Sequence, residues 1–226
     1  NRDALCFTEY LEQMGLRRDK IKTLKDSDAG LIDIYSAIEK WLPAQITPGK
    51  TEVFIYFAGH GLAANNGKDL FLLAHDTDTD MLNRSSIERS ELFDLIHAAN
   101  PKHTFVFLDT CYSGAGRQGE MLMASTRGLV VVEDKQSTIP ENFTIFSAAQ
   151  GNQIASGLDQ VQHGLFSYYA MKGLEGEADF NNDKQITTLE LAQYVENKVR
   201  QGAVSIGREQ VPMMHGNQDI AITNIN

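Results

Sequence analysis

Hydrophobic residues in this chain form two kinds of pattern, short continuous runs and longer segments with helical spacing. Two runs, at 53–57 and 104–108, are almost entirely apolar, and each leads into a polar or glycine-containing turn. Runs of this kind are typical of strands that are buried on both faces of a parallel sheet. Weaker runs predict further strands at 69–74, 128–132 and 143–147.

Segments with apolar residues three or four positions apart lie between these runs. They predict helices over 4–14, 31–42, 88–99, 165–174 and 188–200. Asp28 is placed to cap the second of these helices, and Pro43 is placed to end it. Because strands and helices alternate, we expect an α/β fold with a mostly parallel central sheet flanked by helices.

Composition narrows the classes of protein to consider. The chain has 226 residues, 42% of them hydrophobic, which is enough for a single domain over 1–226. Its net charge of −10 argues against nucleic-acid binding, because phosphate contacts need Lys and Arg. No apolar run reaches the roughly 18 residues of a membrane span. The two cysteines form no disulfide framework, so a reducing compartment such as the cytoplasm is expected.

Two reactive side chains directly follow the two most apolar strands. His60 follows the first and Cys111 follows the second, so both are expected at the carboxyl ends of parallel strands, where α/β folds bind ligands. A cysteine becomes a nucleophile when a histidine lies beside it. Gly59, Gly61 and Gly114 flank the pair and leave backbone N–H groups to hold an oxyanion. Either residue alone would more often be structural, but together they predict a catalytic site.

The segments around this pair resemble a known family. Tyr-Phe-Ala-Gly-His-Gly at 56–61 and Leu-Asp-Thr-Cys-Tyr-Ser-Gly at 108–114 resemble the His-Gly and Asp-x-Cys-x-Ser-Gly motifs of metacaspases and bacterial caspase homologues. Asp109 and Thr110 replace the Gln-Ala of the animal caspase signature, whose histidine also lies about 50 residues upstream. Segments similar to the bacterial branch continue at 146–149, 163–167, 173–176 and 210–212.

The resemblance covers most of the chain and implies a caspase-like sandwich. Such domains usually begin with a hydrophobic strand, which we expect to be missing here because nothing precedes Asn1. The gap suggests a longer parent protein with a sensor or regulatory domain upstream. The substrate would be a protein or peptide, and the chemistry itself would require no cofactor.

The resemblance also implies roles for individual residues. Cys111 would attack the scissile carbonyl, His60 would protonate the leaving amine, and the N–H groups of Gly61 and Cys111 would bind the oxyanion. The chain would thus be a cysteine endopeptidase. The competing interpretation is a catalytically silent caspase-like scaffold, which would have no need of both His60 and Cys111.

Substrate preference is the second implication of the resemblance. Asp109 stands where metacaspases have an acid that binds the Arg or Lys before the cut, and a carboxylate suits a guanidinium. Alternatively, Asp109 caps the turn. Asp3 resembles a second pocket acid, and Ser147 resembles a pocket-wall serine. We therefore expect cleavage after Arg or Lys.

A polar linker over 114–140 lies where caspases are processed. It contains Arg117, Arg127 and Lys135, so an enzyme that cuts after basic residues would be able to process itself there. The alternative is an ordinary solvated loop.

An acidic segment near the C-terminus resembles a calcium-binding loop. Oxygen-bearing residues fall at positions 1, 3, 5, 7, 9 and 12 of the pattern: Asp179, Asn181, Asp183, Gln185, Thr187 and Glu190. Lys184 stands at the sixth position, where the turn calls for glycine. In the alternative interpretation Thr187 caps the following helix and Glu190 completes a capping box.

Overall fold

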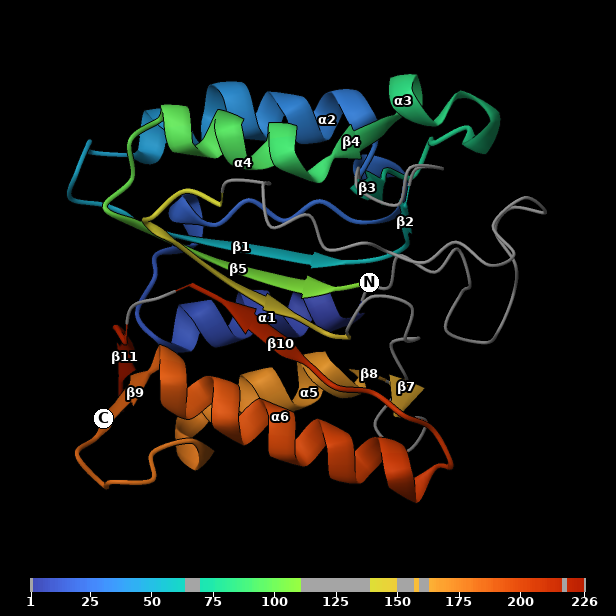
Figure 1. The fold of residues 1–226 in the computed structure, drawn as a ribbon. Helices are drawn as coiled ribbons and strands as arrows, with labels where there is room; N and C mark the ends of the chain where they lie inside the picture. Colours follow the sequence, from blue (N-terminus) through green and yellow to red (C-terminus); the bar gives the residue numbers. More distant parts are fainter. Residues whose placement is uncertain are drawn as a thin grey trace.

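A central sheet with helices on both faces organises the fold (Figure 1). The computed structural model describes residues 2–63, 70–110, 139–149, 157–158, 163–216 and 219–225. Strands and helices alternate along these residues, so the predicted α/β sandwich is confirmed.

Four strands form the central sheet in the order β1-β5-β6-β10. These are β1 (Glu52–Ala58), β5 (His103–Asp109), β6 (Phe143–Ser147) and β10 (Met213–His215). The first three run parallel, and β10 is antiparallel to β6. The mostly parallel sheet is thus confirmed, and β1 is its outer strand within the described residues.

Short antiparallel strands complete the β-structure. A three-stranded sheet contains β2 (Gly61–Ala63), β3 (Leu70–Leu73) and β4 (Ser86–Glu88). Two pairs consist of β7 (Gly157–Leu158) with β8 (His163–Gly164), and of β9 (Gln185–Thr187) with β11 (Ala221–Asn224). Of these strands the sequence predicted only β3, because a strand of two to four residues shows too little periodicity to be recognised.

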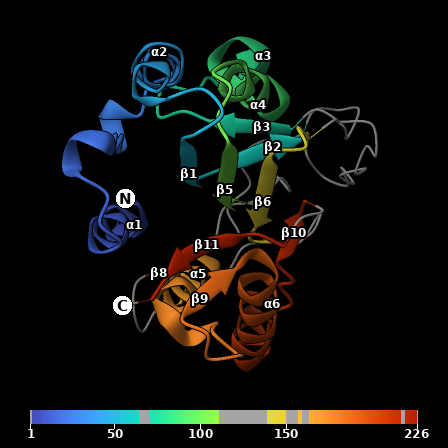
Figure 2. The same cartoon turned by 90° about the vertical axis from the view of Figure 1, so that its left-hand side faces the viewer.

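The helices cover both faces of the sheet, with α2 and α4 on one face and α1, α5 and α6 on the other (Figure 2). The α-helices are α1 (Arg2–Gln13), α2 (Leu31–Ser36), α3 (Leu82–Ser85), α4 (Arg89–Ala98), α5 (Leu165–Lys172) and α6 (Thr188–Ser205). Short helical turns lie at Arg18–Lys20, Asp26–Asp28, Ala37–Trp41, Pro43–Gln45, Thr79–Met81 and Gly173–Glu177. Among the described residues, no helix has both the length and the hydropathy to cross a membrane.

The side chains of β5 alternate between two hydrophobic cores. Phe105 and Phe107 pack into the core beneath α1, α5 and α6, whereas Val106 and Leu108 pack into the core beneath α2 and α4. All four side chains are fully buried. This period-two alternation explains why the run at 104–108 is apolar throughout, since a strand covered on both faces has no solvent-facing positions.

The predicted cap of α2 is wrong. Gly30 is the N-cap residue and offers no side chain, while Asp28 lies in a separate helical turn. The backbone N–H of Leu31 is instead bound by Oδ1 of Asp76 at 2.8 Å. The cap therefore comes from a residue 45 positions away, which no local sequence pattern indicates.

Two further predictions differ from the structure or fall outside it. Helix α6 continues to Ser205, beyond the predicted end at 200, with Gly202 inside it. A Cβ atom at Gly202 would lie 2.8 Å from Leu165, so close packing between α5 and α6 explains the glycine there. The predicted strand at 128–132 and all but the last two residues of the linker 114–140 lie outside the described residues.

Candidate active site

The pairing of β1 with β5 brings the two predicted catalytic segments to the same edge of the sheet. Ala58 lies opposite Asp109 in the parallel register, and the N–H of Gly59 donates to the carbonyl of Asp109 at 3.3 Å. The next residue, His60, is exposed. Cys111 follows Asp109 by two positions and lies outside the described residues. The adjacency expected for the two strands is confirmed.

A tight turn follows β1 and leads into β2. A Cβ atom on Gly59 would approach the ring of Phe57 to 2.9 Å, so glycine permits the chain to turn against this ring. Gly61 then begins β2 and faces Leu72 in the antiparallel register.

The backbone N–H of Gly61 points away from the neighbouring strand. The N–H of Leu73 donates to the carbonyl of His60 at 3.0 Å, which makes Gly61 and Leu72 a non-hydrogen-bonded pair. In such a pair the ladder between β2 and β3 does not use the N–H of Gly61. The oxyanion role expected for this group stays a prediction.

Asp109 is the last residue of β5, and its side chain is completely buried. Its Oδ2 atom accepts a hydrogen bond from the hydroxyl of Ser167 in the first turn of α5. The hydroxyl of Ser167 lies 2.6 Å from that of Tyr56 on β1. Hydrogen bonds between side chains therefore link Asp109, on β5, to α5 directly and to β1 through Ser167.

Asp3 is buried near the same helical turn. Its Oδ2 atom accepts the N–H of Gly164, the N-cap residue of α5, at 3.1 Å. Among the described residues, Asp3 and Asp109 are the only buried carboxylates. Both contact residues at the start of α5, where the helix dipole favours negative charge. The structure therefore gathers the two predicted pocket acids at one place.

Ser147 lies on the far side of β5 from His60. It is the last residue of β6, is buried, and pairs with Leu108 of β5. The next residue, Ala148, donates its N–H to Leu108 and accepts the side-chain amide of the buried Gln210 at 2.8 Å. Ser147 thus shares the carboxyl edge of the sheet with Asp109 and with the end of β1 that precedes His60.

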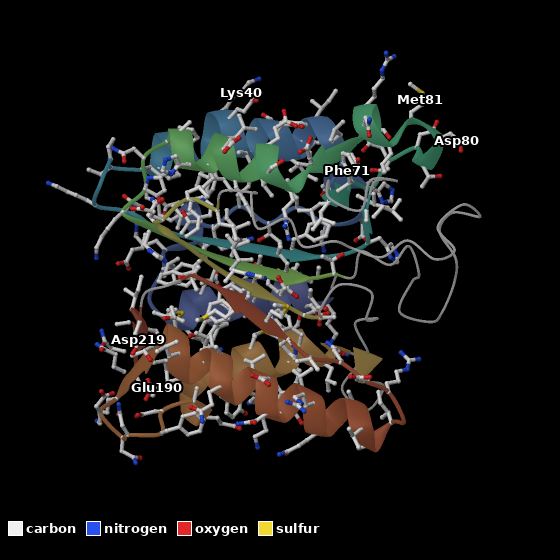
Figure 3. All side chains as sticks on the ribbon, viewed as in Figure 1. Lys40, Phe71, Asp80, Met81, Glu190 and Asp219 are labelled. Carbon is white, nitrogen blue, oxygen red and sulfur yellow. The ribbon has the colours of Figure 1, made fainter. Side chains whose placement is uncertain are left out.

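The acidic loop lies at the opposite end of the molecule from the carboxyl ends of β1 and β5. Figure 3 labels Glu190 and Asp219, which mark this end. The described residues contain no group of three or more His, Cys, Asp or Glu side chains arranged to hold a metal ion. Because of its location at this opposite end, the loop with the predicted calcium ligands is not part of the candidate active site.

Hydrogen bonds within the loop occupy its carboxylates. Asp179 accepts the N–H groups of Asp183 and Lys184 at 3.2 and 3.0 Å. Lys184 adopts φ 65°, the left-handed conformation for which glycine was expected. Thr187 and Glu190 form the capping box of α6, so the capping box that the alternative interpretation predicted is confirmed.

Calcium binding at this loop stays a prediction, and the melting temperature of the protein tests it. Calcium at a hundredfold excess over its dissociation constant is expected to raise the melting temperature by roughly 5–10 °C. The Asp179→Asn variant is expected to lose the rise. An unchanged melting temperature in the parent chain would contradict calcium binding.

Two residues next to the predicted site, Tyr56 and Ser167, lie in segments that resemble the family, but the sequence assigned them no role. Tyr56 is one residue of an apolar strand, and Ser167 resembles any serine in the first turn of a helix. Their contact joins residues 111 positions apart, so only the packing of α5 against the sheet reveals it.

The chain is similar in sequence pattern and in fold to known proteins. A family model described as the caspase domain, Peptidase_C14, matches residues 1–219. The crystal structure of caspase-1 from Spodoptera frugiperda is similar with a TM-score of 0.58 at 13% identity, over 99% of this chain and 81% of that one. A structure of pro-sf-caspase-1 gives 0.57 at 16% identity, over 96% and 79% of the two chains.

At these identities the structural likeness concerns the fold. No curated protein matches the sequence significantly. The family model nevertheless spans almost the full sequence and includes both predicted catalytic segments. The chain belongs to the caspase-domain family of cysteine peptidases.

Proposed function

We propose that the protein is a cysteine endopeptidase that cleaves proteins after Arg or Lys, with Cys111 and His60 as its catalytic pair. The observation that carries the proposal is the register of β1 with β5, in which Ala58 lies opposite Asp109. His60 and Cys111 each follow this matched pair by two positions. Family membership makes peptide-bond hydrolysis by a cysteine the expected chemistry.

The proposed reaction has two stages. His60 takes the proton of the Cys111 thiol, the sulfur bonds to the scissile carbonyl carbon, and the N–H groups of Gly61 and Cys111 stabilise the oxyanion. The C–N bond then breaks as His60 gives a proton to the leaving amine. In the second stage water attacks the acyl-enzyme, which releases the carboxylate product and regenerates the thiol.

The preference for basic residues is proposed from the two buried acids. A substrate guanidinium or ammonium would offset the charge of Asp109, with Asp3 as a second acid and Ser147 as part of the pocket wall. Their burial supports this role, since a buried carboxylate interacts more strongly with a cation than an exposed one does.

We further propose that the enzyme processes itself within 114–140 and acts as a regulated effector in a larger protein. Arg117, Arg127 and Lys135 are the candidate cleavage positions. This proposal depends on the same specificity, because each position would have to enter the pocket for basic side chains.

Fluorogenic peptides that differ only in their last residue test the proposed specificity. Peptides ending in Arg or Lys are expected to be cleaved, and one ending in Asp is expected to resist. A peptide ending in citrulline is the matched control, because it keeps the shape of Arg without its charge. We expect its kcat/KM to be lower than that of the Arg peptide by about 100-fold or more, since it lacks the charge-assisted hydrogen bonds.

The opposite pattern would contradict the proposal. Cleavage of the Asp peptide alone would indicate the preference of animal caspases. Equal cleavage of the citrulline and Arg peptides would show that the positive charge of the substrate side chain does not contribute to recognition.

A further inference from the structure

A buried chain of hydroxyl groups ends on the carboxylate of Asp109. The Tyr56 hydroxyl lies 2.6 Å from Oγ of Ser167, and Ser167 in turn donates to Oδ2 of Asp109. Ser167 and Asp109 are both completely buried. Three elements that are distant in sequence, β1, β5 and α5, thus meet at one carboxylate.

The direction of these hydrogen bonds follows from the groups involved. A carboxylate oxygen accepts and does not donate, so the single proton of Ser167 is directed at Asp109. Tyr56 must then be the donor to Ser167. Two hydrogen bonds in this sense polarise one another and strengthen the bond that reaches the carboxylate.

The two hydroxyl residues of this chain, Tyr56 and Ser167, are held by neighbouring elements. The ring of Tyr56 stacks on Phe7 of α1, with ring centroids 4.6 Å apart and planes 17° from parallel. Ser167 lies three residues after Gly164, whose N–H holds Asp3. A movement of the first turn of α5 would therefore disturb both acids at once.

We propose that Ser167 is a positioning residue, which holds the carboxylate of Asp109 in the orientation that binds a guanidinium through both oxygens. The inference rests on the proposed function, because it assigns to Asp109 the binding of a basic substrate side chain. Each carboxylate oxygen has two acceptor sites, so Oδ2 can receive Ser167 and still accept from a substrate.

The orientation of the carboxylate matters more for Arg than for Lys. Guanidinium is planar and forms two parallel hydrogen bonds, which require the plane of the carboxylate to match its own. An ammonium group behaves as a point charge and tolerates a rotated carboxylate. Ser167 therefore favours Arg over Lys at the residue before the cut.

Kinetics of two variants, compared with a control variant, test this role. In Ser167→Ala, kcat/KM for an Arg-ended peptide is expected to fall about tenfold, mainly through KM, because a hydrogen bond to a charged group is lost. For a Lys-ended peptide the expected fall is about twofold. The Tyr56→Phe variant is expected to shift the Arg-to-Lys ratio in the same direction by a smaller factor.

Thr188→Val is the matched control, because it removes another completely buried hydroxyl, one that binds the backbone N–H of Ile220 far from the site. It is expected to leave the Arg-to-Lys ratio unchanged. Melting temperatures of all variants show which of them are folded, and Tyr56→Phe decides the question if Ser167→Ala does not fold.

The outcomes separate this inference from the proposed function. A parent chain that cleaves neither peptide overturns the proposed function itself. A parent that cleaves both, with an unchanged Arg-to-Lys ratio in the folded hydroxyl variants, overturns the role of Ser167 alone. A ratio that falls equally in Thr188→Val would also overturn it, since any lost buried hydroxyl would then have the same effect.

Discussion

Replacing Cys111 by alanine is expected to reduce peptide cleavage to below about a thousandth of the parent rate, because the attacking sulfur is lost. Self-cleavage within 114–140 is expected to stop as well. Initial rates on an Arg-ended peptide measure the first effect, and the intact mass of the chain after incubation measures the second.

Cys6 supplies a matched control within the same chain. It lies on α1, packed against the core, and Cys6→Ala is expected to retain activity. Burial raises the pKa of the Cys6 thiol, and the nearby carboxylates of Glu9 and Asp3 raise it further. A raised pKa leaves little reactive thiolate at neutral pH.

Iodoacetamide should therefore label Cys111 much faster than Cys6, as followed by mass spectrometry of tryptic peptides. His60→Ala is expected to slow both labelling and turnover, the latter by about 10²–10⁴-fold. If Cys111 reacts no faster than Cys6 and the parent chain cleaves no peptide, the scaffold interpretation replaces the enzymatic one.

Asp109→Asn is expected to lower kcat/KM for Arg- and Lys-ended peptides by about 100-fold or more, since the amide keeps the size of the side chain but loses its charge. The rate of labelling of Cys111 by iodoacetamide is expected to stay near that of the parent, because this small reagent carries no basic side chain. The two measurements together separate substrate binding from reactivity of the nucleophile.

Asp94→Asn makes the same chemical change on an exposed position of α4 and serves as the control. It is expected to cleave like the parent. If Asp109→Asn cleaves the basic peptides as well as Asp94→Asn does, Asp109 has a structural role, such as the capping of its turn.

The hydrophobic pattern predicted the parts of the fold that are periodic. Strands β1, β5 and β6 were predicted to within about a residue at each end, because a sheet covered on both faces requires continuous apolar runs. The short strands β2, β4, β10 and β11 were not predicted, since tertiary pairing and not local pattern defines them. The cap of Leu31 by Asp76 was missed for the same reason.

The sequence predicted the strand ends that carry the proposed site better than it predicted the contacts that support them. His60 and Cys111 were expected directly after neighbouring strands, and the strands that precede them, β1 and β5, do pair. The contact of Asp3 with Gly164 and the chain through Ser167 depend on how α1 and α5 pack against the sheet. Such contacts join residues more than 50 positions apart, and a single sequence carries no signal for them.

Because β1 and β5 pair in a matched register, the alignment of the proposed catalytic pair depends on the packing of the hydrophobic cores. A slip of one residue would turn every side chain of β1 toward the wrong core. A slip of two would restore the burial but move His60 by about 6.6 Å along the strand, beyond the reach of proton transfer. Substitutions deep within either core, far from any substrate, are therefore expected to abolish the proposed activity while His60 and Cys111 themselves remain in the chain.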